Sequence, residues 1–597
     1  MRISRIDDVQ EPIADDRTVT VVGAGGDGVV TFGDLLAQSA AHAGLHVVLT
    51  ESYGPQIRGG EASATVRIAS REIGAQGDAA DIVVVLRWDD FERFRGEIAF
   101  APGALVLHEP PADGAAIPTL DTSNVRLVPI PFAELSRGAA GSPGARNIVA
   151  LGVVSQLLGL PPETIRAAIS HRFRAKGSER MEGNERALAA GQAVARDLAP
   201  TVDLALSSAG GAPRPLLSGN EAVAVGAIHA GCRFFAGYPI TPSTEILQFL
   251  SESLPRMGGT VIQTEDELSA IGAVIGASFA GARAMTATSG PGLSLMTEML
   301  GLASMAEIPT VIVNVQRGGP STGNPTKTEQ SDLWHSLYGT HGDAPRVVLA
   351  CSDVEDSFHA TVEAFNIAEE YQVPVILLSD QSIGQRKQTI SGSALEHEVV
   401  RRALPSAHDL EKYERYRDTE NGVSPMSIPG IRGGEYQTNG LEHDASGRPA
   451  SMYLTHEKMN AKRYRKLWPI RESYRFFRRL GPERADLGIV CWGSSLGAVR
   501  EAVEAANARG ESVAAFVPRM LYPFPKKDFE KFLASVGRLM VVELSYTAQF
   551  YRYLRSFMNL PEQTRVYKRS GGKPLTAKEV EESMTTLFET PVSKAVA

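Results

Sequence analysis

The chain has 597 residues, which is enough for three or four domains. It carries 60 Lys and Arg against 69 Asp and Glu, and the net charge of −9 argues against a general binder of nucleic acid or anionic membranes. Its three cysteines, Cys232, Cys351 and Cys491, are far apart in sequence. They exclude a disulfide scaffold, a CxxC zinc site and a [4Fe–4S] cluster held by this chain alone.

The first sixteen residues lack the apolar core of a signal peptide. No segment approaches the roughly 20 continuous apolar residues of a membrane span. We therefore expect a cytoplasmic protein.

Short β-branched runs alternate with helical stretches in three blocks, which predicts an α/β fold of three domains, each a mainly parallel sheet flanked by helices. The predicted divisions are a first domain over 1–200, a linker over 201–215, a second domain over 216–395, a connector over 396–483 and a third domain over 484–597. The linker contains the Ser/Gly/Pro-rich stretch 207–215. Within the connector, residues 457–480 carry nine Lys or Arg and two Glu.

A glycine loop, GAGGDG, follows the first predicted strand and spans Gly23 to Gly28. With Glu51 at the end of the next strand, it satisfies the pattern of a dinucleotide site, in which backbone amides face a pyrophosphate. The alternative is a tight turn between strand and helix. The same GDG resembles the start of a thiamin diphosphate motif, but the downstream Asn that would hold Mg²⁺ is missing, so we reject that interpretation.

The loop after the second strand, YGPQIRGGE (53–61), places two glycines beside Arg58. Glycine allows close backbone approach, and an Arg side chain offers a fork for a phosphate. The alternative for Arg58 is a solvated side chain on a tight turn.

Four motifs of the second block carry a family resemblance. In chain order they are GYPITPS (237–243), QTEDELSAIGA (263–273), TATSGPG (286–292) and QRGGPSTGNPT (316–326). Together they closely resemble the α subunit of 2-oxoacid:ferredoxin oxidoreductases. The first block, with GAGGDGV and YGPQIRGGEAS, resembles the γ component of that family, and the third block, with PRMLYPFP (518–525), resembles its transketolase-C-terminal-like domain.

The resemblance implies a γ-type domain fused to a thiamin-diphosphate pyrimidine-binding domain, a form similar to 2-oxoglutarate:ferredoxin oxidoreductase. The implied reaction converts 2-oxoglutarate, CoA and oxidised ferredoxin to succinyl-CoA, CO2 and reduced ferredoxin. The implied partners are ferredoxin and a β subunit that carries Mg²⁺, the pyrophosphate half of the thiamin site and a [4Fe–4S] cluster, in an (αβ)2 assembly. No metal site is expected on this chain.

Glu267 is the residue that we expect to contact the pyrimidine ring of thiamin diphosphate. The cofactor reacts after its C2 carbon loses a proton, and a carboxyl group at N1′ favours the tautomer that removes it. By family position Glu267 begins ELSAIGA, at the start of a helix. Glu265 and Asp266 compete for the role, and a plain acidic helix N-terminus is the alternative.

The substrate carboxylate requires a charged donor and hydroxyl groups. Thr241 lies in a turn between two prolines, and Arg317 ends a strand, where sites of α/β proteins gather. By family position Thr326 is a third contact, and Lys327 is a candidate for the distal carboxylate of a dicarboxylic acid. The alternatives are a surface ion pair for Arg317 and a helix N-cap for Thr241.

Other assignments depend on the resemblance in a similar way. Ser289 and Gly290 are expected to approach the thiamin cofactor with their backbone, and Arg58 to contact CoA. Asp27 departs from the family's commoner GxGGQG and would repel a phosphate. The basic run 458–479 is a candidate docking surface for an acidic ferredoxin, or else a solvated helix face or subunit contact.

Three other functions remain open from the sequence. The same chemistry could act on pyruvate, a branched-chain 2-oxoacid or an arylpyruvate. A nucleotide-dependent dehydrogenase would use the GAGGDG loop. A non-catalytic scaffold is disfavoured by the density of thiamin-type motifs.

Overall fold

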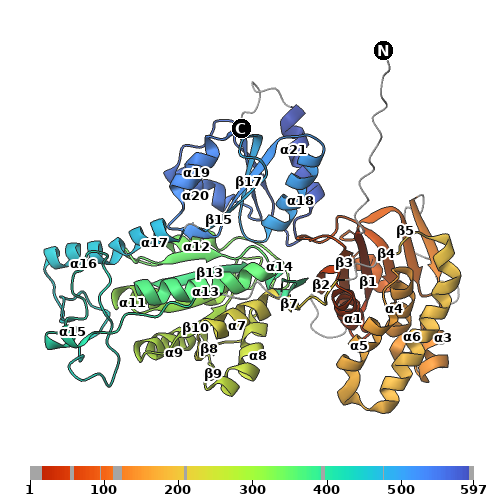
Figure 1. Ribbon diagram of the computed structural model, residues 1–597, viewed down its shortest axis with the longest axis horizontal. Helices are drawn as coiled ribbons and strands as arrows, with labels where there is room; N and C mark the ends of the chain where they lie inside the picture. The colour runs from red at the N-terminus through yellow and green to blue at the C-terminus, as the bar shows by residue number, and fades with distance from the viewer. Residues whose placement is uncertain are drawn as a thin grey trace. The chain divides into compact units, whose positions relative to one another are not determined.

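The computed structural model describes residues 16–53, 60–94, 96–111, 124–206, 211–391, 397–474 and 476–589 (Figure 1). The chain divides into two compact units. The first contains the chain up to Leu216 together with Lys387–Ile390, and the second contains Leu217–Arg386 and the chain from Ser391 onward. Within the described ranges, no helix is both long enough and apolar enough to cross a bilayer.

The first unit is built on a mixed sheet with the order β6-β5-β4-β1-β3-β2-β14. Its strands are β1 (Asp16–Ala24), β2 (His46–Tyr53), β3 (Glu61–Ala69), β4 (Ala80–Val85), β5 (Phe100–His108), β6 (Val125–Pro129) and β14 (Lys387–Thr389). Strands β1, β4, β5 and β6 run parallel, whereas β3 lies between β1 and β2 and is antiparallel to both.

Helices accompany this sheet. They are α1 (Val29–His42), α2 (Trp88–Phe94), α3 (Phe132–Ala140), α4 (Arg146–Leu157), α5 (Pro162–Phe173) and α6 (Ser178–Leu198). The buried residues of the sheet form one large core with α1 and α3–α6 and a second, smaller one with α2. Helices α4 and α6 pack closely because Gly152 and Gly191 face the partner backbone. A Cβ at Gly191 would stand 2.0 Å from the carbonyl oxygen of Val149. The short strand β7 (Leu216–Ser218) lies at the boundary of the two units.

The second unit contains a seven-stranded sheet with the order β18-β12-β13-β11-β10-β8-β9. Its strands are β8 (Phe234–Gly237), β9 (Thr260–Gln263), β10 (Ala284–Thr288), β11 (Thr310–Gln316), β12 (Val347–Ala350), β13 (Pro374–Asp380) and β18 (Met520–Tyr522). All pairs are parallel except β12 with β18. Both faces of the central strands are buried, as continuous apolar runs such as TVIVNVQ predict.

The helices of this part of the second unit follow the strands in chain order. They are α7 (Gly219–His229), α8 (Thr244–Ser253), α9 (Glu267–Phe279), α10 (Gly290–Leu295), α11 (Thr297–Met305), α12 (Leu333–Tyr338), α13 (Val354–Tyr371) and α14 (Gln381–Gln385). The segment that follows is mostly irregular and contains α15 (Ala407–Glu411), α16 (Tyr453–Arg465) and α17 (Leu467–Ser473).

A five-stranded sheet with the order β15-β17-β16-β19-β20 completes the second unit. Its strands are β15 (Phe477–Leu480), β16 (Ala485–Cys491), β17 (Val513–Pro518), β19 (Val536–Glu543) and β20 (Arg565–Lys568), and its helices are α18 (Ser495–Ala508), α19 (Lys526–Leu533), α20 (Gln549–Phe557) and α21 (Ala577–Glu589). The predicted class is therefore confirmed: the chain contains three mixed, mainly parallel α/β sheets.

The two sheets of the second unit share one hydrophobic core. Ile271 and Ile312 from the first belong to the same buried cluster as Trp492, Phe516 and Phe550 from the second. Strand β18 crosses between them, since it follows β17 in sequence but pairs with β12. Strand β15 lies before residue 484, where the sequence placed the start of the third domain, yet it pairs with β17.

Candidate functional site

The predicted site residues gather where three neighbouring parallel strands end. β8, β10 and β11 lie side by side in the seven-stranded sheet, and the motifs YPITP, TSGPG and QRGG follow them directly (Figure 1). Carboxyl ends of parallel strands meet at one edge, where α/β proteins bind their ligands. The fold thus brings Thr241, Ser289, Gly290 and Arg317 to the same edge.

Burial separates the three competing carboxylates of TEDE. Glu265 is exposed, and Asp266 caps α9, since its Oδ1 accepts a hydrogen bond from Ser269 N at 2.7 Å. Glu267 is only 5% exposed, and within the described residues its carboxylate accepts no hydrogen bond. A buried carboxyl without a donor requires a partner of some kind, so Glu267 is the member of the three suited to hold a ligand.

The start of α10 lies directly against Glu267. A Cβ on Gly292 would stand 2.6 Å from Cγ and Oε1 of Glu267 and 2.0 Å from Oγ1 of Thr288. Only glycine fits there, which explains the last glycine of TSGPG. Ser289 is completely buried, and its Oγ has no hydrogen-bond partner.

Arg317 is held beside Thr241. Its Nη1 donates a hydrogen bond of 2.5 Å to the carbonyl oxygen of Thr241, whereas its Nε is buried without an acceptor. Arg317 is 7% exposed, and burial lowers the pKa of its guanidinium. This is not the surface ion pair that was the alternative for Arg317, because the charge is buried and incompletely paired. The Thr241 side chain does not cap α8, for which Ser243 occupies the N-cap position.

Thr326 and Lys327 lie on the loop that follows Arg317. The loop folds back on itself through hydrogen bonds from Gly318 N to Lys327 O and from Lys327 N to Asn324 O, at 2.9 and 3.1 Å. Both residues are half-buried. The stem of Lys327 packs against Gly572, where a Cβ would lie 2.3 Å away, so this loop is supported by the third sheet's domain.

These observations fit the pyrimidine half of thiamin diphosphate. The site offers a buried carboxyl without a donor, the buried Ser289 hydroxyl without a partner, and a glycine-lined backbone approach. Glu267 is the residue that would hold the ring. Among the described residues, no cluster of three or more His, Cys, Asp or Glu is arranged to bind a metal ion.

The first unit does not have the strand order of a dinucleotide-binding domain. In that fold the strand bearing the ribose-binding acid is parallel to β1 and next to it, but here the antiparallel β3 separates β1 from β2, which carries Glu51. Asp27 also occupies a backbone amide of the glycine loop, because its Oδ2 accepts a hydrogen bond from Ala24 N at 3.0 Å. Its carboxylate forms an ion pair with Arg146. Arg58 and its loop lie outside the described residues.

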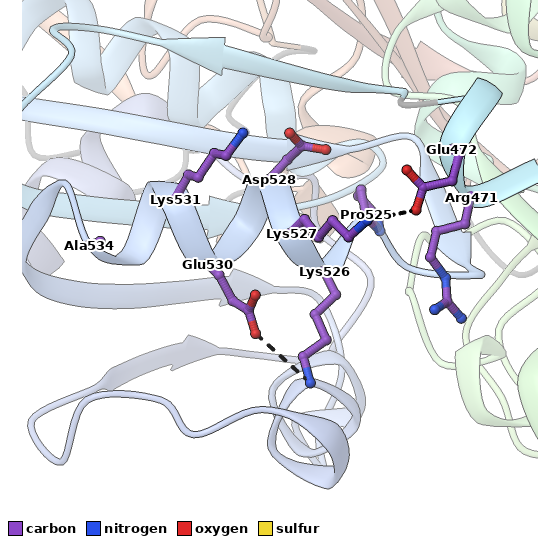
Figure 2. A pocket seen from close by; sticks show the side chains of 9 residues that line it. All are labelled: Arg471, Glu472, Pro525, Lys526, Lys527, Asp528, Glu530, Lys531 and Ala534. Atoms are coloured by element: carbon purple, nitrogen blue, oxygen red, sulfur yellow. Dashed lines mark hydrogen bonds and ion pairs between the residues drawn. The ribbon is translucent and has the colours of Figure 1, made fainter. Parts of the chain in front are cut away.

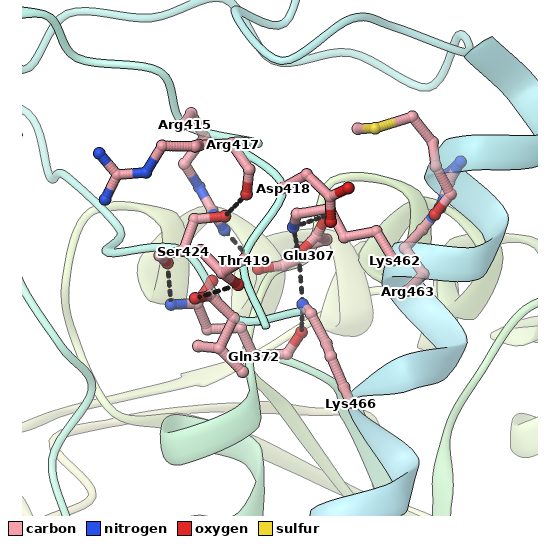
Figure 3. Close-up of polar contacts among 12 residues, drawn as sticks. Glu307, Gln372, Arg415, Arg417, Asp418, Thr419, Ser424, Lys462, Arg463 and Lys466 are labelled. Carbon is pink, nitrogen blue, oxygen red and sulfur yellow. Dashed lines mark hydrogen bonds and ion pairs between the residues drawn. The ribbon is translucent and has the colours of Figure 1, made fainter. Parts of the chain in front are cut away.

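The basic run 458–479 does not form a solvated cationic face. Lys462 and Lys466 are buried and pair with Glu307 (Figure 3). The buried Arg463 pairs with Glu442. Arg465 pairs with Asp418. The predicted docking surface is therefore wrong for these members of the run, because their charges are neutralised inside the second unit.

Arg471 is an exposed cation of the same run. It lines a groove of about 560 Å³ between α17 and α19 (Figure 2). The groove mixes signs, because Lys527 pairs with Glu472 at 2.9 Å and Lys526 lies 3.9 Å from Glu530. It is therefore not a uniformly basic surface.

Three family models match the chain. They are described as "Pyruvate ferredoxin/flavodoxin oxidoreductase" (residues 18–194), "Pyruvate flavodoxin/ferredoxin oxidoreductase, thiamine diP-bdg" (225–462) and "Pyruvate:ferredoxin oxidoreductase core domain II" (485–580). The "2-oxoglutarate synthase subunit KorA" of Methanothermobacter thermautotrophicus is 39% identical over 60% of this chain and 94% of its own length. The chain belongs to the α subunits of the 2-oxoacid:ferredoxin oxidoreductases.

Two relatives of this α subunit cover the γ-like region as well. The "2-oxoacid:ferredoxin oxidoreductase 2, subunit alpha" of Aeropyrum pernix is 30% identical over 97% of this chain and 99% of its own. The solved 2-oxoglutarate:ferredoxin oxidoreductase of Magnetococcus marinus, with 2-oxoglutarate, coenzyme A and succinyl-CoA bound, is 36% identical, covers 96% of this chain and 100% of its own, and superimposes with a TM-score of 0.89. The recognition of the family from its motifs is thus confirmed.

Sequence patterns did not indicate a site role for Asp332 or Asn314 of this α subunit, and they included Gly292 only as the end of the TATSGPG motif. Asp332 precedes an apolar helix and has the pattern of an ordinary N-cap, and Asn314 lies within a strand. Only the spacing of TSGPG could have indicated Gly292. The structure places Asp332 against Gly290 and Gly292 against Glu267, and Asn314 donates a hydrogen bond to Asp332.

Proposed function

We propose that this chain is the α subunit of a 2-oxoglutarate:ferredoxin oxidoreductase. It converts 2-oxoglutarate, CoA and oxidised ferredoxin to succinyl-CoA, CO2 and reduced ferredoxin, in a reversible reaction. The observation that carries the choice of substrate is the match along nearly the whole chain to the Magnetococcus marinus enzyme, which is described with 2-oxoglutarate and succinyl-CoA bound. The KorA relatives, named as 2-oxoglutarate synthase subunits, support the same choice.

The positions of the chain's residues support the following roles. When bound, thiamin diphosphate supplies a carbon nucleophile for the 2-oxo group and a sink for the electrons released with CO2. Glu267 holds the pyrimidine N1′, and Ser289 and Gly290 bring backbone to the ring. Arg317, Thr241 and Thr326 hold the carboxylate next to the reacting carbonyl, which fixes its orientation.

Two further contacts belong to the proposal. Lys327, beside Thr326, meets the distal carboxylate and so favours a dicarboxylic acid over pyruvate. Arg58, on the γ-type domain, contacts CoA. Mg²⁺, the pyrophosphate half of the thiamin site and the [4Fe–4S] cluster belong to a separate β subunit, with which the chain forms an (αβ)2 assembly.

Exposed apolar side chains beside Glu267 support a partner at this edge. Leu268, in the first turn of α9, is 47% exposed, and Leu295, the last residue of α10, is 48% exposed. Tyr238, which follows β8, and Ile262, which lies on β9, are exposed to a similar extent. β9 is also the edge strand of its sheet, with β8 as its neighbour on one side only among the described residues. Exposed apolar residues and open strand edges of this kind mark protein interfaces.

The test is co-purification of the native complex, followed by an assay of a panel of 2-oxoacids for CoA-dependent reduction of a viologen dye. We expect the highest kcat/KM with 2-oxoglutarate and formation of succinyl-CoA. A preference for pyruvate, a branched-chain 2-oxoacid or an arylpyruvate would overturn the choice of substrate but leave the chemistry intact. Dye reduction that requires NAD and not CoA would overturn the proposal itself.

A further inference from the structure

Asp332 lies at the N-terminus of α12 without capping it. An aspartate in this position ordinarily accepts a hydrogen bond from the first helical turn, but the side chain of Asp332 makes no such bond. Its Oδ2 instead accepts a hydrogen bond from Asn314 Nδ2 at 3.0 Å, and its backbone N–H donates to Gln316 Oε1 at 3.1 Å. The carboxyl is thus held over the carboxyl end of β11, at the candidate site.

The same carboxyl lies directly against the TSGPG loop. A Cβ on Gly290 would stand 2.9 and 3.0 Å from the two oxygens of Asp332. Side chains are therefore excluded at Gly290 by Asp332. The two residues form a fixed wall of the site. Among the described residues, the side chain that donates a hydrogen bond to the Asp332 carboxyl is that of Asn314.

Three charged or titratable groups face Asp332. Arg317 comes from the end of β11, His335 from α12 and Glu329 from the preceding loop. Burial, which is the largest effect, and Glu329 oppose the ionised form of Asp332, whereas the hydrogen bond from Asn314 and the charges of His335 and Arg317 favour it. The net effect is a raised pKa of Asp332. Within the described residues Asp332 and Arg317 form no salt bridge, yet each influences the charge of the other.

The side chain of Asn314 has an acceptor that is free to receive a hydrogen bond from a neutral neighbour. Asn314 is completely buried, and its Oδ1 has no donor. A carboxylate can only accept hydrogen bonds, whereas a carboxylic acid has one O–H to donate. A neutral Asp332 therefore has an O–H that it can donate, which an ionised one lacks.

We propose that Asp332 is a positioning residue that acts through Arg317 on substrate affinity. As a neutral acid it leaves the guanidinium free to hold the carboxylate of the 2-oxoacid; as a carboxylate it competes for that charge and repels the substrate. This inference rests on the proposed function, in which Arg317 binds the substrate carboxylate. It implies that, at pH values above the pKa of Asp332 in the free enzyme, binding of the 2-oxoacid anion is coupled to uptake of up to one proton from solvent by Asp332.

The direction of the pH effect follows from this coupling. Substrate binding favours the protonated form of Asp332, so the affinity for substrate falls as the pH rises above the pKa of Asp332 in the free enzyme. For one coupled proton, Kd and KM then increase by up to about tenfold per pH unit. Removal of the titrating group should abolish this slope and leave a pH-independent affinity.

The experiment uses the assembled complex and its Asp332→Asn variant, which retains shape and can donate to Asn314 Oδ1. Oxalylglycine, in which an amide carbonyl replaces the reactive ketone of 2-oxoglutarate, serves as the binding probe. Calorimetry in two buffers of different ionisation heat counts the protons taken up, and steady-state assays give KM and kcat against pH. Asp343→Asn, which changes an exposed aspartate shortly after α12, is the control.

We expect net proton uptake and a KM that rises with pH in the wild type and in Asp343→Asn, and neither effect in Asp332→Asn. The inference is overturned if Asp332→Asn retains the wild-type proton uptake, or if it lowers kcat without altering the pH dependence of KM, since that would be a structural role. Arg317→Gln separates the two proposals. If that variant binds the probe as tightly as the wild type, the assignment of Arg317 fails, whereas an unaltered proton count in Asp332→Asn refutes only the role of Asp332.

Discussion

Neighbouring residues of one motif have different environments at the candidate site. In TEDE, Glu265 is exposed, Asp266 caps α9 and Glu267 is buried without a donor. The sequence favoured Glu267 through its family position, but the residues alone left the three carboxylates equivalent. Which of the three carboxylates is buried depends on how the first turn of α9 is rotated about the helix axis. The order of residues in a single acidic cluster does not determine that rotation.

We predict that Glu267→Gln abolishes activation of thiamin in the assembled complex. An amide at N1′ does not stabilise the tautomer that removes the C2 proton, so we expect C2 hydrogen–deuterium exchange, followed by NMR after acid quench, to slow by about 10²-fold or more. Glu265→Gln, which changes an exposed neighbour, should exchange normally. Near-normal turnover in Glu267→Gln would refute the assignment.

Lys327 is the residue that we expect to discriminate between dicarboxylic and monocarboxylic substrates. Lys327→Ala should raise the KM for 2-oxoglutarate by about tenfold, which corresponds to a loss of about 1.4 kcal/mol of binding free energy. The KM for pyruvate should change much less, because pyruvate has no distal carboxylate. Lys327→Arg keeps the charge and should preserve the preference; equal effects of Lys327→Ala on both substrates would remove the distal role.

At the scale of elements, the strands were more predictable than the connections between them. Buried β-branched runs predicted the parallel strands of the second unit because both faces of such strands are apolar. The insertion of β3 between β1 and β2 and the transfer of β18 to another sheet were not predictable. These pairings depend on long-range contacts, and local patterns do not specify the partner of a strand.

The basic segment was misjudged for a similar reason. Lys462 of helix α16 and Lys466 at its C-terminal end point inward and pair with Glu307. Arg415 Nη2 donates to the Glu307 carbonyl oxygen at 2.7 Å. Charge runs are usually solvated, and nothing within residues 457–480 indicates the buried Glu307 about 150 residues earlier. A formal charge count therefore overestimates the exposed positive charge of α16.

We predict that Glu307→Gln destabilises the second unit strongly. The substitution leaves Lys462, Lys466 and Arg415 buried without a counter-charge, which costs about 3–5 kcal/mol for comparable buried pairs. Urea unfolding of the purified chain, followed by circular dichroism, measures the loss. Glu298→Gln, on the exposed face of α11, should change the free energy of unfolding by less than about 0.5 kcal/mol; equal effects of the two variants would contradict the prediction.

Lys466 should give this cluster a measurable pH dependence. Burial lowers the pKa of Lys466 to about 7 from its ordinary 10.5, although Glu307 opposes the shift. Between those pH values the unfolded chain holds a proton that the folded chain lacks. The free energy of unfolding should therefore rise with pH in this window, by up to about 1.4 kcal/mol per unit, and this contribution is lost as the pH falls towards 7.

The variant Lys466→Met tests this slope. It keeps an unbranched apolar stem but has no titrating group, so urea unfolding between about pH 7 and pH 10 should show a smaller increase of stability with pH than the wild type. Lys458→Met is the matched control, since Lys458 is an exposed lysine of the same helix, 63% open at its side chain. Identical slopes in the wild type and Lys466→Met would show that the buried ammonium does not titrate in this range.

At the scale of the whole molecule, the chain supplies one part of a redox enzyme. The matches to family models extend over the γ-like, thiamin-binding and core II regions. The candidate site lies at an edge whose neighbouring apolar side chains are exposed. Electron transfer to ferredoxin requires a redox centre that accepts electrons one at a time, as an iron–sulfur cluster does.

We therefore predict that the chain purified alone is colourless and free of stoichiometric iron. A [4Fe–4S] cluster is held by four cysteine thiolates, whereas the chain has three cysteines, all of them buried as free thiols. Burial raises the pKa of Cys232 and of Cys351 to about 12, which disfavours the thiolate form that binds iron. Iron and acid-labile sulfide analysis of the isolated chain, beside the co-purified complex, decides the matter. Stoichiometric iron in the isolated chain would place the electron-transfer centre here and contradict the division of labour with a β subunit, whereas iron in the complex alone is the expected result.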